Sequence, residues 1–291
     1  MTIKKLFSKS NLKPDFKFRQ NGNIWRLFFN NSNFIAGETR DINSKQAYIF
    51  SYNIVEKKEY LKNFRFDENW WFAIDTMTDN TIIVSNFQKP EMPVHQGFKV
   101  LDLKTGNIIW KNDDLEYFFA DNKSVFAVKH LFESRVIYRL NHDDGSIMEE
   151  YKGDGILTAE LLKNENDLKM YEGLINTEIM DLNDPLLLNR YSPVLSNLGN
   201  LKIEGEIEYI EFDKYLILNH HTVNGIDLKN IERKILTNTL EIYTQENAGM
   251  EFTDILNRET SSYVPDSFFV RNGYLFYIRE KSELICIKLN N

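Results

Sequence analysis

The amino-acid sequence predicts an all-β fold built from repeated units of four antiparallel strands. Residues 98–111, FKVLDLKTGNIIWK, read as two strands joined by a tight turn, in which Gly106 supplies the positive φ of a short hairpin. Weaker copies occur as SYNIVEKKEYL at residues 51–61 and RLNHDDGSIMEEY at residues 139–151. Four-strand units begin at residues 24, 71 and 117, which are 47 and 46 residues apart. A period of this length holding four strands is typical of β-propeller blades.

The first three units can be assigned strand by strand, because turn residues separate short apolar runs. Strands are expected at residues 24–29, 34–38, 48–52 and 58–61, then at 70–74, 81–87, 98–103 and 107–111, and then at 117–120, 124–130, 135–140 and 146–151. Inner strands of a propeller are covered on both faces, so continuous apolar runs are expected there. The runs TIIV at residues 81–84 and YLIL at residues 215–218 fit that position.

The pattern weakens after Gly155. We interpret residues 155–200 as a degenerate fourth blade or an insertion, with a short helix as the alternative, and residues 238–264 as an irregular insertion. Regular strands return at residues 207–212, 214–219 and 224–228, and the last unit has strands at 267–270, 274–279 and 283–289.

The last unit is one strand short, and residues 16–18 near the N-terminus form a weak spare strand. We therefore predict a β-propeller of about six blades, closed by N- and C-terminal strands that share one blade, because shared closure removes a free sheet edge. A single domain over residues 1–291 is expected, since closed all-β folds often reach this length.

Composition limits the classes of partner. The net charge of −8 works against a nucleic-acid partner, which requires clustered Lys and Arg. No apolar stretch is long enough for a signal or for a membrane span, so we expect a cytoplasmic protein with no membrane partner. We also expect a monomer. The single cysteine, Cys286, lies in the alternating run LICIKL and is expected to be buried and inert.

The stretch DLKTGNIIW at residues 102–110 resembles the repeat of the quinoprotein (PQQ-like) β-propellers, in which a strand ending in Asp-x-x-Thr-Gly leads to a strand closing on Trp. The WD40 repeat is a poorer match. The resemblance covers about fifteen residues closely, and it implies the fold. The quinoprotein dehydrogenases have an adjacent cysteine pair at their cofactor, which a chain with one cysteine lacks. We therefore expect a distant, non-catalytic member with no cofactor.

Motifs of specific chemistry are absent from the sequence: there is no phosphate loop, no HExxH, no GxSxG and no CxxC. His220 and His221 are adjacent, so a strand would point them to opposite faces, and no metal site is expected. The segments NDDLE (112–116) and NHDDG (141–145) are interpreted as turns rather than calcium loops. The acidic residues at positions 204, 206, 208 and 211 are interpreted as a solvated strand face.

Aligning the units places five polar residues at the ends of second strands. They are Glu38, Asn86, His130, His220 and Arg279. In a propeller these strand ends share one face near the central channel, together with the loops at residues 39–45 and 87–97. We predict that the five side chains form a ligand-binding set on this loop-rich face.

Two functions follow as hypotheses. The favoured one is a non-catalytic β-propeller that binds a protein partner or a small ligand on the loop-rich face. The alternative is an enzyme, a hydrolase or lyase, with His130, His220, Glu38 and Arg279 as acid, base and oxyanion support at the mouth of the channel.

Overall fold

The computed structural model describes residues 12–67, 70–89, 92–199, 201–227 and 230–289. The chain divides into two compact units, one of Gln20–Glu172 and one of Met1–Arg19 with Gly173–Asn291. Each unit is described by itself, and the single domain over residues 1–291 stays a prediction.

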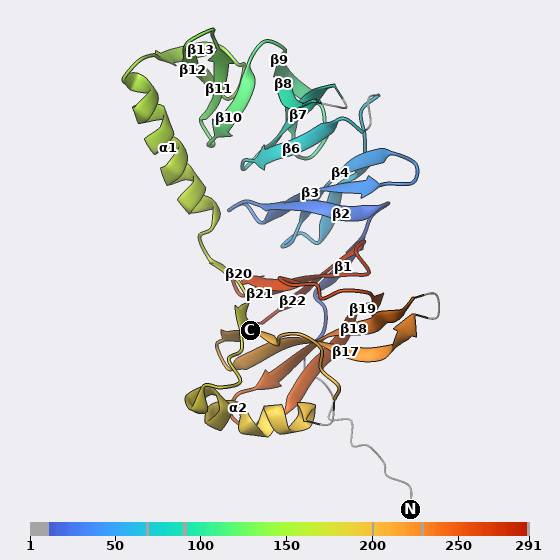
Figure 1. The fold of residues 1–291 in the computed structure, drawn as a ribbon. Coiled ribbons are helices and arrows are strands. Elements are labelled where there is room, and N and C mark those ends of the chain that lie inside the picture. Colours follow the sequence, from blue (N-terminus) through green and yellow to red (C-terminus); the bar gives the residue numbers. More distant parts are fainter. Residues whose placement is uncertain (1–11, 68–69, 90–91, 200, 228–229, 290–291) are drawn as a thin grey trace, which may run out of the picture. The chain divides into compact units, whose positions relative to one another are not determined.

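Three antiparallel sheets make up the unit Gln20–Glu172 (Figure 1). The first sheet contains β2 (Asn23–Phe29), β3 (Phe34–Asp41), β4 (Gln46–Asn53) and β5 (Lys58–Phe64). The second contains β6 (Phe72–Met77), β7 (Thr81–Lys89), β8 (Met92–Asp102) and β9 (Ile108–Asn112). The third contains β10 (Glu116–Ala120), β11 (Ser124–His130), β12 (Arg135–Asn141) and β13 (Ile147–Tyr151). In each sheet the strand order follows the chain order, as the four-strand repeat predicts.

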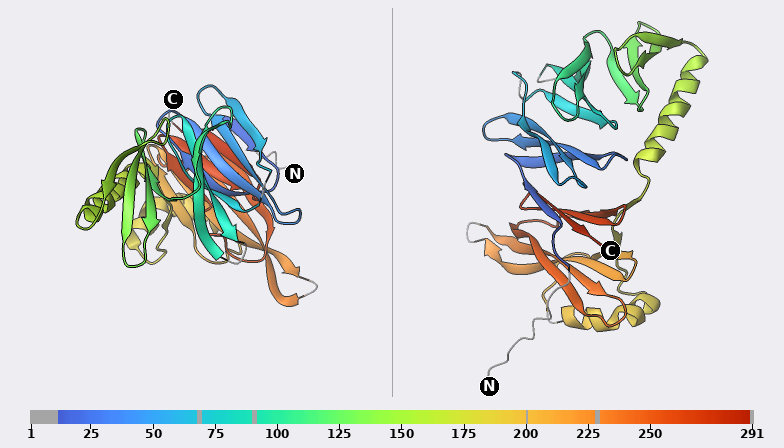
Figure 2. Two further views of the ribbon diagram at one scale, coloured as in Figure 1. Left: turned by 90° about the horizontal axis from the view of Figure 1, so that it is seen from above. Right: turned by 180° about the vertical axis from the view of Figure 1, so that it is seen from behind.

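The other unit holds two five-stranded sheets. The fourth sheet contains β15 (Glu178–Ile179), β16 (Glu208–Phe212), β17 (Tyr215–Asp227), β18 (Asn230–Thr244) and β19 (Met250–Thr260). The fifth contains β1 (Phe16–Arg19), β14 (Leu174–Ile175), β20 (Phe268–Arg271), β21 (Tyr274–Arg279) and β22 (Glu283–Lys288). β1 pairs with β22, and Figure 2 shows this blue strand beside the red ones. The prediction that the two ends of the chain share one sheet is confirmed, whereas the described residues form five sheets rather than about six.

Residues 155–200 do not form a degenerate blade. They hold α1 (Gly155–Met170) and α2 (Pro185–Leu198), with β14 and β15 between them. The sequence of α1 contains four Leu, two Glu and two Lys residues and has no run of β-branched residues, which favours a helix. The Asp184 side chain caps α2 by accepting from the Leu186 amide at 2.8 Å, and Pro185 follows at the first helical position. The helical alternative was therefore the better reading.

Two further predictions about irregular segments were wrong. Residues 238–264 lie largely in β18 and β19, whose register runs from Leu236–Thr260 to Tyr243–Met250. The expected loop at residues 87–97 is mainly an extension of the β7–β8 hairpin, and β3 continues to Asp41. The physical reason is the same for each segment. Polar residues can continue a strand beyond the core when hydrogen bonds to the neighbouring strand satisfy their backbone N–H and C=O groups.

The cores lie between and beside the sheets. Ile82 and Val84 pack into the core between the first two sheets, while Ile83 packs into the core between the second and third. Strand β7 is therefore covered on both faces, as expected for an inner strand. In the other unit Ile217 belongs to the core between the fourth and fifth sheets, and Leu218 packs on the α2 side. Cys286 is in no disulfide and is fully buried, as expected.

Glycines close two hairpins against aromatic rings of the preceding sheet. Gly106 has φ +74°, and a Cβ there would lie 2.6 Å from the Phe64 ring; Gly145 has φ +73°, and a Cβ there would lie 2.6 Å from the Trp110 ring. Each glycine thus serves a left-handed turn and a close approach of the backbone to a ring.

Replacing Gly106 with alanine is therefore expected to lower the free energy of unfolding by about 3 kcal/mol, from backbone strain and overpacking against Phe64 together. Gly153 is the matched control, because its φ of +52° is also positive but nothing lies within 4 Å of an added Cβ. Gly153→Ala should cost about 1 kcal/mol. Urea unfolding followed by circular dichroism measures both, and equal losses would contradict the contact with Phe64.

Candidate functional site

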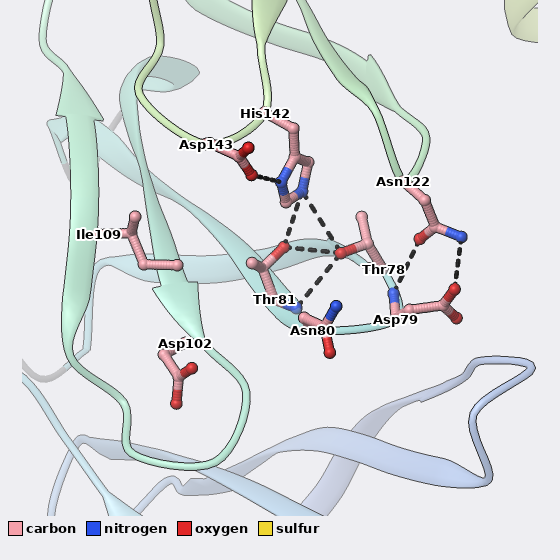
Figure 3. Close-up of a pocket in the computed structure, with 9 residues that line it drawn as sticks. All are labelled: Thr78, Asp79, Asn80, Thr81, Asp102, Ile109, Asn122, His142 and Asp143. Carbon is pink, nitrogen blue, oxygen red and sulfur yellow. Dashed lines mark hydrogen bonds and ion pairs between the residues drawn. The ribbon is translucent and has the colours of Figure 1, made fainter.

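A pocket of about 270 Å³ lies among turns of the second and third sheets (Figure 3). The turn between β6 and β7 and the hairpins β8–β9, β10–β11 and β12–β13 supply its lining. The lining residues are Thr78, Asp79, Asn80, Thr81, Asp102, Ile109, Asn122, His142 and Asp143. All of them belong to the unit Gln20–Glu172, so the pocket is defined within one compact part of the chain.

His142 holds a position that recurs in all five sheets. In each sheet, a residue just after the third strand of the repeat donates its backbone N–H to a carbonyl in the turn between the first two. The five bonds are Ile54 to Asn33, Leu103 to Asn80, His142 to Lys123, Gln245 to Lys214 and Leu289 to Gly273, at 2.8–3.2 Å. Three of these five positions carry buried aliphatic side chains. The backbone hydrogen bond at this position therefore does not require a histidine.

The imidazole of His142 is tied to two hydroxyls. Its Nε2 lies 3.0 Å from Thr81 Oγ1 and 3.4 Å from Thr78 Oγ1, and the two hydroxyl oxygens are 2.7 Å apart (Figure 3). The ring is buried, with the residue 7% exposed. Burial lowers the pKa of His142, against the opposing charges of Asp143 and Asp121. The neutral imidazole is therefore the favoured form at neutral pH.

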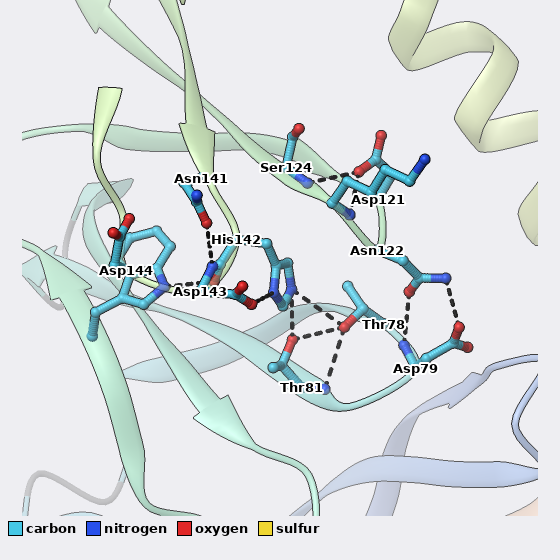
Figure 4. A network of polar contacts seen from close by, with 12 residues as sticks. Thr78, Asp79, Thr81, Asp121, Asn122, Ser124, Asn141, His142, Asp143 and Asp144 are labelled. Atoms are coloured by element: carbon cyan, nitrogen blue, oxygen red, sulfur yellow. Dashed lines mark hydrogen bonds and ion pairs between the residues drawn. The ribbon is translucent and has the colours of Figure 1, made fainter. Parts of the chain in front are cut away.

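Side-chain amides and carboxylates join the neighbouring turns (Figure 4). Asn122 Oδ1 accepts from the Asp79 backbone N–H at 2.9 Å, and Asn122 Nδ2 donates to Asp79 Oδ2 at 2.7 Å. Asn141 Oδ1 accepts from the Asp143 N–H at 2.8 Å, and Asp144 Oδ1 accepts from the Ser146 N–H at 2.9 Å. The interpretation of NHDDG as a turn that satisfies its own backbone is confirmed.

The same outcome holds for NDDLE, where Asn112 Oδ1 accepts from the N–H groups of Asp114 and Leu115 at 3.0 and 2.9 Å. Within the described part of the chain, no group of three or more His, Cys, Asp and Glu residues is arranged to hold a metal ion. No helix among the described residues is long and apolar enough to cross a membrane.

The pocket wall is acidic. Asp79, Asp102 and Asp143 carry carboxylates, and none of the nine described lining residues is Lys or Arg. The remaining polar groups are hydroxyls, amides and the neutral imidazole. Coulomb interaction with the three carboxylates therefore favours a positively charged occupant over an anionic one.

Thr81, His142 and Asp143 bring a hydroxyl, an imidazole and a carboxylate next to one another in space. Catalytic sites use the same order of groups as nucleophile, base and orienting acid. The geometry does not suit that chemistry. Asp143 Oδ1 is 4.0 Å from His142 Nδ1, beyond hydrogen-bond distance, and its side chain is 96% exposed. Thr81 is only 3% exposed, and its hydroxyl is also bonded to Thr78. The arrangement serves better as a fixed wall than as an activated nucleophile.

The five residues predicted as a ligand-binding set have separate partners. In the unit Gln20–Glu172, Glu38 is fully buried and accepts from Arg40 Nε at 2.5 Å and from the Ile74 N–H at 3.1 Å. Asn86 is half-buried in β7, opposite Phe72 of β6. His130 is exposed at the end of β11, with Nε2 3.3 Å from Glu116 Oε2.

In the other unit, His220 is 2% exposed and its Nε2 lies 3.5 Å from Glu241 Oε2. Arg279 pairs with Asp254 at 3.2 Å and with Glu283. Within each unit, no hydrogen bond or ion pair among the described residues joins two members of the predicted set. Glu38 and Arg279 thus have structural partners in place, and the binding role of the set stays a prediction.

The interpretation of the acidic residues at positions 204, 206, 208 and 211 as a solvated strand face was wrong for Glu208. Glu208 is 3% exposed, whereas Glu206 is exposed. Alternation along β16 places Glu208 on the same side as Ile210, which packs into the core between the fourth and fifth sheets.

The pocket at His142 was not predicted, although a signal for it exists in the sequence. When the hairpins ending in DLKTG and NHDDG are aligned from their first residues, His142 falls on the position of the apolar Leu103. A histidine at a repeat position where three of the five sheets have an aliphatic residue marks a departure from the blade pattern.

The sheets define the class of this chain. Antiparallel four-stranded repeats in chain order, with the N-terminal strand completing the C-terminal sheet, are the structure of a β-propeller protein. A family model described as a domain of unknown function, DUF4905, matches residues 30–110. No curated protein matches the sequence.

Solved structures similar to this chain include BamB from Moraxella catarrhalis, at 8% identity over 95% of this chain and 99% of that one, with a TM-score of 0.32. The β-propeller domain of the Trilobed protease from Pyrococcus furiosus is similar at 9% identity over 89% of this chain and 78% of that one, with a TM-score of 0.31. With TM-scores this low, neither similarity carries an argument about function.

Proposed function

We propose that the protein is a non-catalytic β-propeller that binds a positively charged group in the pocket at His142. The group is either a lysine or arginine side chain of a protein partner or a small cationic ligand. The observation that carries the proposal is the composition of the pocket wall, three carboxylates with no described basic residue among nine. In this proposal the binding site lies on the turns of the second and third sheets and not at the predicted polar set.

The size of the pocket supports an occupant of side-chain dimensions. Pockets for drug-sized ligands usually measure about 300–1,000 Å³. A volume of about 270 Å³ lies just below that range and suits one long side chain or a small amine. Ile109, which is 46% exposed, offers an apolar surface for the methylene stem of such a side chain.

The hairpin pattern supports a distant, non-catalytic relation to the quinoprotein repeat. In this proposal Trp110, the residue that closes the repeat, has a structural role: its ring packs against Gly145, and its Nε1 donates to the His142 carbonyl at 2.8 Å. A tryptophan used in this way joins neighbouring sheets and supports the turn that carries His142.

The test is a thermal shift with N-acetylargininamide and N-acetyl-lysinamide, with N-acetylglutaminamide as the neutral match. At tenfold above Kd the cationic probes should stabilise the protein by about 1.4 kcal/mol, a rise in Tm of about 3 °C. The double variant Asp102→Asn, Asp143→Asn should lose this rise, because it removes two charges while the asparagine at position 102 keeps the side-chain acceptor of its turn. Asp114→Asn, an exposed position outside the pocket, should retain it. An equal shift with the neutral amide, or an unchanged shift in the double variant, would refute the proposal.

A further inference from the structure

The segment between β19 and β20, residues 261–267, is fastened to the fourth sheet by two buried titratable side chains. The Val264 backbone N–H donates to His221 Nε2 at 3.2 Å. The Asp266 backbone N–H donates to Glu208 Oε1 at 2.7 Å. His221 is 0% exposed and Glu208 is 3% exposed. The closed position of this segment therefore depends on the protonation of side chains that water does not reach.

The bond from Val264 sets the state of the imidazole. Nε2 can accept a hydrogen bond only when it carries no proton, so the closed segment requires a neutral ring with its proton on Nδ1. That Nδ1 is buried and has no hydrogen-bond partner among the described residues. The Tyr263 ring covers the imidazole at 4.8 Å between centroids. Protonating Nε2 would remove the acceptor of the Val264 amide and bury a charge without a partner.

Groups from each neighbouring element bear on this site. On β17 the adjacent His220 opposes a second positive charge. β16 and the segment before it contribute Glu208, Glu206 and Glu204. The backbone N–H of Glu204 donates to the His221 carbonyl at 2.9 Å. On β18 the residue opposite His221 is the neutral Asn238. On the segment itself are Tyr263 and Asp266.

The two titrating groups respond to burial in opposite directions. Burial, and then the charge of His220, lowers the pKa of His221 to about 4. Burial raises the pKa of Glu208, although the bond from Asp266 opposes this. The closed state is thus destabilised by acid through His221, and it is favoured by acid through Glu208. A protonated Nε2 of His221 cannot accept from the Val264 amide, whereas Oε1 of Glu208 can still accept from the Asp266 amide when a proton is on Oε2, so acid should open the segment.

The rest of the segment has fixed anchors at its C-terminal end. Ser267 Oγ donates to the Val264 carbonyl at 2.7 Å, and Asn238 Nδ2 donates to Ser267 Oγ at 3.1 Å. Thr177 Oγ1 donates to Asp266 Oδ1 at 3.0 Å. The bonds from Asn238 and Thr177 do not involve His221, so residues 266–267 can stay in place while residues 261–264 move and the bond from Ser267 to the Val264 carbonyl breaks.

Residues 261–263 also line a second pocket. It measures about 500 Å³, and Gly205 and Leu236 form part of the opposite wall. A Cβ on Gly205 would lie 3.1 Å from the Tyr263 ring, so this ring packs closely on the backbone of the segment before β16. Movement of Tyr263 therefore changes the shape of this pocket.

We propose that residues 261–264 form a pH-sensitive latch: His221 in its neutral form holds the latch closed, and protonation of His221 releases it and opens the pocket beside Tyr263. The open state should be favoured as the pH falls from about 6.5, the ordinary value for an exposed histidine, towards 4. Between pH 7 and pH 5 protonation of His221 alone lowers the ratio of closed to open latch about 20-fold, and protonation of Glu208 acts against this change.

Hydrogen exchange measured by mass spectrometry tests the latch on the full chain. Protection of a peptide covering residues 261–267, corrected for the intrinsic rate at each pH, should fall by up to about 20-fold between pH 7 and pH 5. Amides of β18 at residues 238–242 should keep their protection, which separates local opening from global unfolding. Equal protection of residues 261–267 at both pH values would overturn the proposal.

Variants identify the titrating group. His221→Asn keeps a side-chain acceptor for the Val264 amide but cannot titrate, so the loss of protection in acid should disappear. The matched control is His220→Gln, on the opposite face of β17, which should keep most of it. If His221→Asn does not fold, an NMR titration of the wild-type protein decides: the Val264 amide must shift together with the His221 ring. A Val264 amide that stays unchanged while the His221 ring titrates refutes the latch.

Discussion

Replacing Glu38 with leucine is expected to lower the free energy of unfolding by about 3 kcal/mol. Glu38 is fully buried, and its Oε2 accepts from the Ile74 N–H of the second sheet. The substitution would leave Arg40, whose side chain is 13% exposed, without its carboxylate. Arg40 keeps hydrogen bonds to the Phe72 carbonyl at 2.6 Å and to the Trp70 carbonyl at 3.3 Å. Because its charge stays partly compensated, the expected loss of stability is at the lower end of the range for breaking a buried ion pair.

The control is an exposed pair of the same unit. His130 and Glu116 are 62% and 37% exposed, so Glu116→Gln should change stability by less than about 1 kcal/mol. The double variant Glu38→Leu, Arg40→Met should recover part of the loss, because two apolar side chains replace the ion pair together. Urea unfolding measures all three variants. A loss at Glu38 no larger than at Glu116 would contradict the structural role assigned to Glu38.

Replacing Phe18 with alanine is expected to cost about 3–4 kcal/mol and to detach β1 from the fifth sheet. Phe16 and Phe18 are 8% and 6% exposed, and β1 pairs with β22 from Phe16–Cys286 to Arg19–Glu283. Because β1 has only four residues, its pairing depends on the burial of these two rings. Loss of β1 would leave the edge of β22 unpaired and prone to association with other chains.

The alternating residues of the same strand provide the control. Lys17 lies between the two phenylalanines and is exposed, so Lys17→Ala should change stability by less than about 0.5 kcal/mol. Urea unfolding gives the stability, and size-exclusion chromatography at increasing concentration detects association. An equal effect of the two substitutions would show that closure by β1 does not rest on its buried face.

The regular part of the fold could be predicted because its signals are local. Short apolar runs, turn glycines and a constant spacing located the twelve strands of the first three sheets to within a few residues, except that β8 begins six residues before its predicted start. For residues 155–200 a helix was only the alternative to a degenerate blade. The four-strand repeat had been extended into a segment whose own residues favour helices. In that segment local propensity was the better guide than the repeat.

The candidate site was predicted less well than the fold. Alignment of strand ends identifies positions that are equivalent in the repeat, but it does not show which side chains already have partners. Glu38 and Arg279 stand at such positions, and each already forms an ion pair, Glu38 with Arg40 and Arg279 with Asp254. His142 lies in a turn that reads as an ordinary hairpin, and its contacts with Thr78 and Thr81 join residues about 60 positions apart.

The sequence by itself determined the all-β class, the four-strand repeat and the sharing of one sheet by both ends of the chain, because each depends on period, turn chemistry and strand count. Only the tertiary structure decided that Glu208 and His221 lie buried beneath residues 261–267 and that four turns enclose a pocket at His142. Those arrangements depend on contacts between distant segments, for which strand periodicity carries no signal.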